Sequence, residues 1–322
     1  MTSQVTVGRG QSCARSDRAG RRRPLQARSG LRHWSAVRVA ANVIVVAGNN
    51  ERMETMVDAG AGRQLKCPQF AEPVWSVLAG TPAARTPVFD PSTLSGLVAP
   101  ARRLLARALP PGVALNSTVE LTMVGEIKLA GRWFGFDAVQ ILRAGVGFVW
   151  APEVGGRLLR FSGADVLGPE DARLEFRLHG RLPLVRGSGP DIRRSARGRL
   201  AAETVAWLPQ ALAPQSGARW TGIDDQRAVV TLDVDGTQVD VEVTVGDDGR
   251  LVQLGLERWK DSKPPALAPF GGSVESVLTT EEGVVIAGSG TVGWDWRTPA
   301  ESDGAFFRYR IESARFGSDS AP

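Results

Sequence analysis

The sequence predicts an α+β protein that is mainly antiparallel β, with a curled sheet (a half-barrel) closed by one central helix. Runs of alternating apolar and polar residues follow one another over residues 118–313, and short turns join nearly all of them, as in antiparallel sheets. One long helical pattern separates two groups of these runs. A single antiparallel sheet of about fourteen strands has to curl, because strand twist accumulates across the sheet.

The central helix is predicted over 191–208. Ile192, Ala196 and Leu200 follow one another at four-residue spacing, which places them on one face of the helix. Gly198 stands in the middle, where glycine costs about 1 kcal/mol relative to alanine. We therefore expect the sheet to approach the helix closely at this glycine.

A short helix is predicted over 100–109, where Pro100 suits the first turn. Asp235-Gly236 is a strong hairpin signal between two strands, and Gly125 indicates a bulge or a bend in the first strand. The candidate strands are 118–129, 132–142, 145–151, 158–161, 173–179, 181–185, 220–223, 228–234, 238–245, 250–259, 270–280, 284–287, 290–296 and 305–313.

The chain is predicted to divide into four parts: a disordered basic tail or mis-assigned start over 1–70, a linker over 71–97, a single β-rich domain over 98–317 and a disordered tail over 318–322. Residues 1–70 hold 12 of the 39 Lys and Arg but 4 of the 34 Asp and Glu. The rest is therefore slightly acidic, and we expect no nucleic-acid binding by the folded domain.

Two further interpretations of the N-terminal region stay open. Met53 or Met56 could be the true initiator, or residues 37–48 could be the apolar core of an atypical export signal. The basic region is too long for an ordinary signal peptide, and the apolar run is too short to span a membrane. We expect a cytoplasmic protein, with export by an atypical signal left open.

A set of motifs between about Pro100 and Phe316 occurs together in this chain. They are the helix from Pro100 that ends in Leu109-Pro110-Pro111-Gly112, Gly125-Glu126-Ile127-Lys128-Leu129, Trp133, Phe136, Ala138, Gln140, Gly147-Phe148-Val149-Trp150, Glu203, Trp207-Leu208-Pro209, Ala211-Leu212, Arg219-Trp220, Ile223-Asp224-Asp225 and Gly290-Thr291-Val292-Gly293-Trp294. With these motifs the chain resembles an uncharacterised bacterial family of unknown function with a LolA-like, lipoprotein-carrier-like half-barrel fold. The resemblance implies this architecture and hints at ligand binding, but it brings no established reaction.

Most catalytic motifs are missing from the sequence. There are two histidines, His33 and His179, and two cysteines, Cys13 and Cys67, so neither a His- or Cys-rich metal site nor a disulfide framework is expected in the folded part. No G-x-S-x-G elbow and no Walker A sequence is present. We expect no cofactor and no metal, and we interpret His179 as a residue at a strand end.

Our first hypothesis is a non-catalytic protein that binds an apolar small molecule or a lipid in the half-barrel. Core filling is the alternative explanation for the aromatic residues, because cores and apolar pockets use the same side chains. The candidate ligand-binding residues are Trp133, Phe136, Phe148, Trp150, Glu203, Trp207, Trp220 and Trp294.

Two other hypotheses stay open: a carboxylate-dependent enzyme that uses Glu203 or Asp224 in the same cavity, and a structural or interaction module. Glu203 lies one turn before Trp207, near the apolar face, and a buried carboxylate there needs a partner, for which Arg219 is a candidate. Asp224 has the simpler interpretation of an Asp-rich turn. We expect a monomer, and the membrane surface stays open as a partner.

Overall fold

The computed structural model describes residues 38–40, 43–45, 65–80, 86–156 and 159–317. Most of 1–70 and all of 318–322, the two predicted tails, lie outside the described residues. Within them, Arg38–Ala40 (β1) and Val43–Val45 (β2) form an antiparallel pair.

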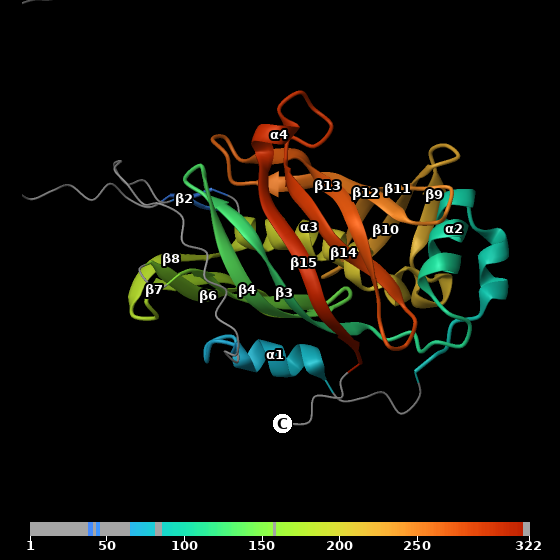
Figure 1. Cartoon of the computed structure of the whole chain (residues 1–322), viewed down its shortest axis with the longest axis horizontal. Helices are drawn as coiled ribbons and strands as arrows, with labels where there is room; N and C mark the ends of the chain where they lie inside the picture. The colour runs from blue at the N-terminus through green and yellow to red at the C-terminus, as the bar shows by residue number, and fades with distance from the viewer. Residues whose placement is uncertain (1–37, 41–42, 46–64, 81–85, 157–158, 318–322) are drawn as a thin grey trace, which may run out of the picture. The chain divides into compact units, whose positions relative to one another are not determined.

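One antiparallel sheet of 13 strands organises the described part of the chain, and Figure 1 shows it curling around a central helix. The order of its strands is β8-β7-β6-β5-β4-β3-β15-β14-β13-β12-β11-β10-β9. The strands are β3 (Thr118–Leu129), β4 (Arg132–Arg143), β5 (Gly147–Gly155), β6 (Arg160–Leu167), β7 (Ala172–Leu178), β8 (Leu182–Ser188), β9 (Arg219–Gly222), β10 (Arg227–Val234), β11 (Thr237–Val245), β12 (Leu251–Lys260), β13 (Ala266–Thr279), β14 (Val285–Trp294) and β15 (Ala305–Phe316).

The first strand of this sheet along the chain, β3, lies in its middle. The chain runs from there to one edge, crosses to the other edge and returns to the middle. Strands β3 to β8 form a first arm, strands β9 to β15 form a second arm, and β15 closes the gap by pairing with β3. The two free edges, β8 and β9, are consecutive along the chain, and helix α3 (Pro190–Trp207) joins them. It contacts strands of both arms. The predicted half-barrel with a central helix is confirmed.

Gly198 lies where α3 touches β12. A Cβ atom at this position would lie 3.0 Å from Cγ of Arg258 and 3.3 Å from Cδ1 of Leu256. The predicted close approach is confirmed, and it explains why a residue that weakens helices is used in the middle of the helix.

The outer face of the first arm carries a second, smaller core. Helix α1 (Glu72–Ala79) packs there, and Leu78 is fully buried with Ile141 and Val149 of the sheet. The sequence predicts a linker over 71–97, whereas the structure has α1 in this stretch. Apolar residues at 70, 74 and 78 carry the helical spacing that would have indicated it.

The remaining helices are short. Helix α2 (Ala99–Ala108) lies beside β9, β10 and β11 at one end of the half-barrel (Figure 1). The others are the 3₁₀ helices η1 (Pro91–Gly96), η2 (Pro209–Leu212) and η3 (Pro214–Ser216), and the single turn α4 (Glu301–Gly304). Among the described residues, no helix is long and apolar enough to cross a membrane.

Two details of the strand prediction differ from the structure. The candidates 284–287 and 290–296 belong to the single strand β14. The pairing of β3 with β4 is regular past Gly125, so no bulge lies there. A Cβ at Gly125 would lie 2.0 Å from the carbonyl oxygen of Arg308 and 2.9 Å from the Phe136 ring, so the glycine allows close packing.

We predict that Gly198→Val destabilises the protein by about 2–3 kcal/mol, because the added atoms press against Arg258 and Leu256 in a packed core. Ala106→Val, at an exposed position of α2, is the matched control for the cost of a β-branched residue in a helix, about 0.5 kcal/mol. Urea denaturation of both variants checks this. Equal losses in the two variants would mean that the contact at Gly198 is unimportant.

Candidate functional site: the interior of the half-barrel

A cluster of buried ion pairs joins α3 to the first arm. Arg199 donates from Nε to Oε1 of Glu203 at 2.6 Å and from Nη1 to Oδ2 of Asp165 on β6 at 2.7 Å. Gln140 on β4 donates to the other oxygen of Glu203, also at 2.6 Å. The Asp165 side chain is 2% exposed and that of Arg199 14%, so these pairs are largely shielded from solvent. Removing one partner of such a shielded pair would leave an uncompensated buried charge, which strongly destabilises a protein.

Arg258 of β12 approaches the same helix from the second arm. It is 2% exposed, and its Nε donates to the backbone oxygen of Ser195 at 3.0 Å. Its guanidinium lies 4.5 Å from the ring centroid of Phe270 and 5.4 Å from that of Trp294. Burial, with the nearby charge of Arg199, lowers the pKa of Arg258 to about 9.

A second set of ion pairs fixes the first half of α3. Arg193 binds Asp235 with both Nε and Nη2 at 2.7 Å, and Arg197 donates to the same carboxylate at 2.8 Å. Asp235 occupies the turn between β10 and β11, which confirms the predicted hairpin. Arg193 also donates to the backbone oxygen of Pro169, in the turn between β6 and β7, at 2.6 Å. One side chain of α3 therefore bridges both arms.

Glu203 has its carboxyl pKa raised above the ordinary value. Burial is the main cause and the neighbouring Asp165 adds to it, while the guanidinium of Arg199 and the amide of Gln140 act in the opposite direction. The carboxyl group is held on both oxygens by these two partners. Arg219, the partner expected from the sequence, is exposed on β9 instead.

Six of the eight candidate ligand-binding residues lie inside the half-barrel. Phe136 and Trp150 pack edge to face at 5.7 Å, Trp207 meets Tyr309 at 5.3 Å, and Phe148 lies under Arg199 at 4.6 Å. Those six are Phe136, Phe148, Trp150, Glu203, Trp207 and Trp294. All six side chains are largely buried in the main core, so they occupy space that the sequence predicts as a cavity.

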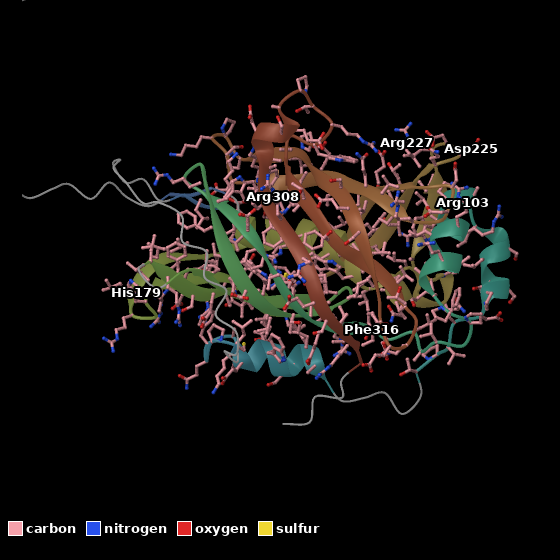
Figure 2. The ribbon with its side chains drawn as sticks, in the orientation of Figure 1. Arg103, His179, Asp225, Arg227, Arg308 and Phe316 are labelled. Carbon is pink, nitrogen blue, oxygen red and sulfur yellow. The ribbon has the colours of Figure 1, made fainter. Side chains whose placement is uncertain are left out.

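The other two candidates lie elsewhere. Trp133 is on the outer side of β4, because residues alternate along a strand and Phe134 packs against the main core. The guanidinium of Arg308 lies 4.2 Å from its ring centroid, and Figure 2 labels Arg308 on β15. Trp220 packs at the margin of the core and donates to the backbone oxygen of Leu212 at 3.0 Å.

Asp224 lies in an exposed turn, apart from Glu203. Its carboxylate accepts from the backbone of Gln226 and from the backbone and side chain of Arg227, and these hydrogen bonds lower its pKa. Figure 2 shows Arg227 beside Asp225 on the surface. The two carboxylates named for an enzyme therefore do not share a cavity.

Sequence reasoning missed most of the polar cluster, although a signal was present. Asp165 is separated from Phe161 and Leu167 by an even number of positions, and Arg258 is separated in the same way from Leu254 and Leu256. Because every second residue of a strand lies on the same face, the strand period alone places both charged residues on the apolar face. A charged residue in register with buried leucines indicates a buried ionic contact. The i, i+4 spacing of Arg199 and Glu203 was also readable.

An apolar recess lies at the end of the half-barrel that α2 covers. Leu104 and Ala108 of α2, Val205 and Ala206 of α3, and Ile286 of β14 contribute to its wall. Arg107, Arg250 and Val277 also line it, and both arginines are exposed. It holds about 20 Å³, which is room for one water molecule. We call this space the α2 recess.

Helix α2 is held less firmly than α3. Its apolar face packs on the core, but its polar contacts are exposed or long. Arg103 donates to the backbone oxygen of Asp225 at 2.6 Å (Figure 2), and Arg107 lies 4.0 Å from Asp248. Exposed pairs of this kind contribute at most about 1 kcal/mol.

Neither a metal centre nor a histidine catalyst emerges from the described residues. In that part of the chain, no three His, Cys, Asp or Glu side chains gather where they could hold a metal ion. His179 is exposed in the turn after β7 (Figure 2), as expected of a residue at a strand end.

Fold and interior together define an antiparallel half-barrel that wraps a central helix. The chain belongs to the DUF6544 family of unknown function, whose model matches residues 87–306. The predicted membership in a family of unknown function is thereby confirmed. No curated protein matches the chain in sequence.

The solved structures that match the chain are distant in sequence and have low TM-scores. One is a putative outer membrane lipoprotein-sorting protein domain from Vibrio parahaemolyticus, 11% identical, with a TM-score of 0.37 over 69% of this chain and 92% of that one. Another is a LolA-superfamily protein from Nitrosomonas europaea, also 11% identical, at 0.36 over 70% and 96%. A DUF1329-family protein from Desulfovibrio piger, 11% identical, scores 0.30 over 73% and 95%.

We predict that Arg199→Met destabilises the protein by about 3–5 kcal/mol at neutral pH, because it leaves two buried carboxylates without their common partner. Without the guanidinium the pKa of Glu203 rises further. The folded variant then binds a proton more readily than the unfolded chain, so its deficit shrinks as the pH falls.

Denaturation curves of Arg199→Met and the parent protein at several pH values check both parts. Arg310→Met is the matched control, since Arg310 is 63% exposed and pairs with Glu312, itself 45% exposed, at 3.0 Å. It should lose no more than about 1 kcal/mol. A deficit in Arg199→Met that stayed constant with pH would contradict the ionic origin of the effect.

Proposed function

We propose that this protein binds an apolar, lipid-like ligand inside the half-barrel, and that the ligand enters under α2. The observation that carries the proposal is the α2 recess, an apolar space that leads from the surface toward the core. Apolar walls with a few polar groups at the mouth are typical of sites for small apolar molecules.

The difference between the two helices supports this route. Buried ion pairs attach α3 to both arms, whereas α2 relies on its apolar face and on exposed polar contacts. An element held mainly by apolar packing can exchange that packing for contact with an apolar ligand at little net cost. Helix α2 is therefore the element that moves in our proposal.

The proposal requires an open state that is larger than the α2 recess of the described structure. Pockets for molecules of lipid size enclose about 300–1,000 Å³, far more than the recess holds as described. A ligand would bind the open state and shift the population toward it. The scattered surface apolar residues give no support to an interaction module, because Val77, Leu182 and Leu267 lie on three different elements.

We predict that the purified full chain binds oleyl alcohol, detected as a mass shift by native mass spectrometry. Val277→Trp should lower the bound fraction several-fold, because the indole fills the α2 recess that Val277 lines. Val277 is half-buried, and the larger ring should cost about 1–3 kcal/mol of stability, so folding of the variant is checked first by circular dichroism.

Val229→Trp is the matched control, because Val229 is also half-buried on a strand but does not line the α2 recess. It should bind as the parent protein does. No binding by the parent protein would refute the proposed function. Equal loss of binding in both variants would place the entry elsewhere.

A further inference from the structure

The hairpin of β7 and β8 is basic, although the folded part of the chain as a whole is not. Over Ala172–Ser188 it holds four arginines and one carboxylate, Glu175, a formal charge of +3 with His179 neutral. Beyond residue 70 the chain holds 27 Lys and Arg (39 − 12) and 30 Asp and Glu (34 − 4). Positive charge is therefore concentrated on one hairpin of a slightly acidic domain.

The tip of this hairpin lies at one end of the sheet. β8 is a free edge of the sheet, and Figure 2 shows His179 at the turn, at the opposite end of the view from Arg103 of α2. The chain from Arg177 to Arg186 contains Arg181 and no acidic residue. Asp171 precedes β7 and therefore lies at the base of the hairpin rather than at its tip.

Glu175 holds two of the arginines at the outer face. It accepts from Arg177 at 2.8 Å and lies 3.1 Å from Nη2 of Arg186, while its own side chain is 5% exposed. The side chains of Arg177 and Arg186 stay 47% and 67% exposed. One carboxylate balances one of the two guanidinium groups, so an excess positive charge remains at the surface. Arg181, at the turn, is exposed and adds to it.

The tip also exposes an apolar side chain. Leu182 is 64% exposed, the largest exposed fraction among the large apolar residues that the structure describes as exposed. It stands opposite Leu178 in the hairpin, and Pro183 beside it is exposed as well. Transfer of a leucine from water to an apolar medium is favourable. A partner with an apolar layer would therefore stabilise this tip.

Protection of a free sheet edge does not explain these features. Charged side chains and prolines on an edge strand prevent it from pairing with another sheet, and Pro183 and Arg186 fit that role. Charges of either sign would serve this purpose, and an exposed leucine would not. The excess of positive charge and the exposure of Leu182 need another explanation.

We propose that the tip of the β7–β8 hairpin docks on a membrane surface that contains anionic lipids. Leu182 enters the boundary between headgroups and acyl chains. The arginines of the tip, Arg177, Arg181 and Arg186, lie against the lipid phosphates. Apolar and basic residues act together in this way when a protein binds a membrane without spanning it. The proposal goes beyond the proposed function, because it concerns the outer surface and holds whether or not a ligand enters under α2.

A nucleic acid fits the hairpin less well. Proteins that bind single strands offer aromatic rings on which bases stack. Phe176, the only Phe, Trp or Tyr of the hairpin, is 1% exposed and lies in the main core. A phosphate backbone would contact the arginines but would leave Leu182 in water. The leucine therefore favours a bilayer, in which an apolar layer lies beneath the charges.

The test places an environment-sensitive fluorophore at the tip. The full chain with Leu182→Cys is labelled with nitrobenzoxadiazole, in a background with Cys13→Ser and Cys67→Ala so that only this position reacts. It is mixed with phosphatidylcholine vesicles that contain about 30% phosphatidylglycerol or none. We expect a blue shift and a several-fold rise in emission with the anionic vesicles alone. High salt should abolish this response, because salt screens exposed charges.

The matched control is Leu267→Cys, labelled in the same way, since Leu267 is 59% exposed but lies on β13. Its emission should not change. A label at position 182 that does not respond to anionic vesicles would overturn the proposal. If the chain sedimented with the vesicles in that case, docking would belong to another surface, such as the basic N-terminal region. Equal responses at the two positions would also overturn the proposal.

Arg181→Glu tests the contribution of charge. Arg181 is exposed, so the change should leave the fold intact, which circular dichroism checks. Half-maximal response of the label at position 182 should then need at least about fivefold more anionic lipid, because basic residues near the surface attract these lipids at short range. Arg219→Glu is the control, since Arg219 is exposed on β9, the other free edge, and the net charge changes equally. Equal weakening by both variants would mean that net charge, rather than the hairpin, determines binding.

Fluorescence anisotropy of labelled polyuridylate covers the other class of partner. Arg181→Glu should not change the affinity of the full chain for polyuridylate. Weaker binding of polyuridylate by this variant, together with unchanged binding of anionic vesicles, would assign the hairpin to a nucleic acid and overturn the proposal.

Discussion

The rest of the structure depends on the position of α3 between the two arms of the sheet. Its two ends connect the free edges of one sheet, β8 and β9, so the helix has to cross the interior for the chain to return. Gly198 lets it approach β12, and Arg193 and Arg199 tie it to both arms. Curvature of the sheet, burial of the aromatic residues and the shape of the interior all follow from this crossing.

The interior combines two properties that are usually kept apart. Most of it is a packed apolar core, yet it contains two arginines and two carboxylates close to one helix. Buried ionic groups cost more than apolar ones of similar volume, and a buried pair is weak evidence for stability alone. Arg199 has a structural explanation in its two carboxylate partners, whereas Arg258 is held by the backbone of Ser195 and by two aromatic rings.

Sequence periodicity predicted most of the fold, because alternation and four-residue spacing report which side of each element is buried. The bounds of β3 and the close contact at Gly198 are examples. It missed α1, although apolar residues at 70, 74 and 78 carry the helical spacing over this short helix. It also failed for the partner of Glu203, although Arg199 lies four residues earlier on the same helix and its spacing was readable. The sequence predicted that most of the aromatic residues lie in the interior. It did not decide whether they fill a core or line a cavity, because both use the same residue types.

Our central claim is that α3 is fixed while α2 moves to admit a ligand. Hydrogen exchange of the full chain, followed by mass spectrometry with and without oleyl alcohol, measures this most directly. Amides of α2 should exchange faster than those of α3 in the free protein, and the ligand should change exchange in α2 and in β12–β14. Exchange in α3 as fast as in α2, or a ligand effect confined to other elements, would contradict the account.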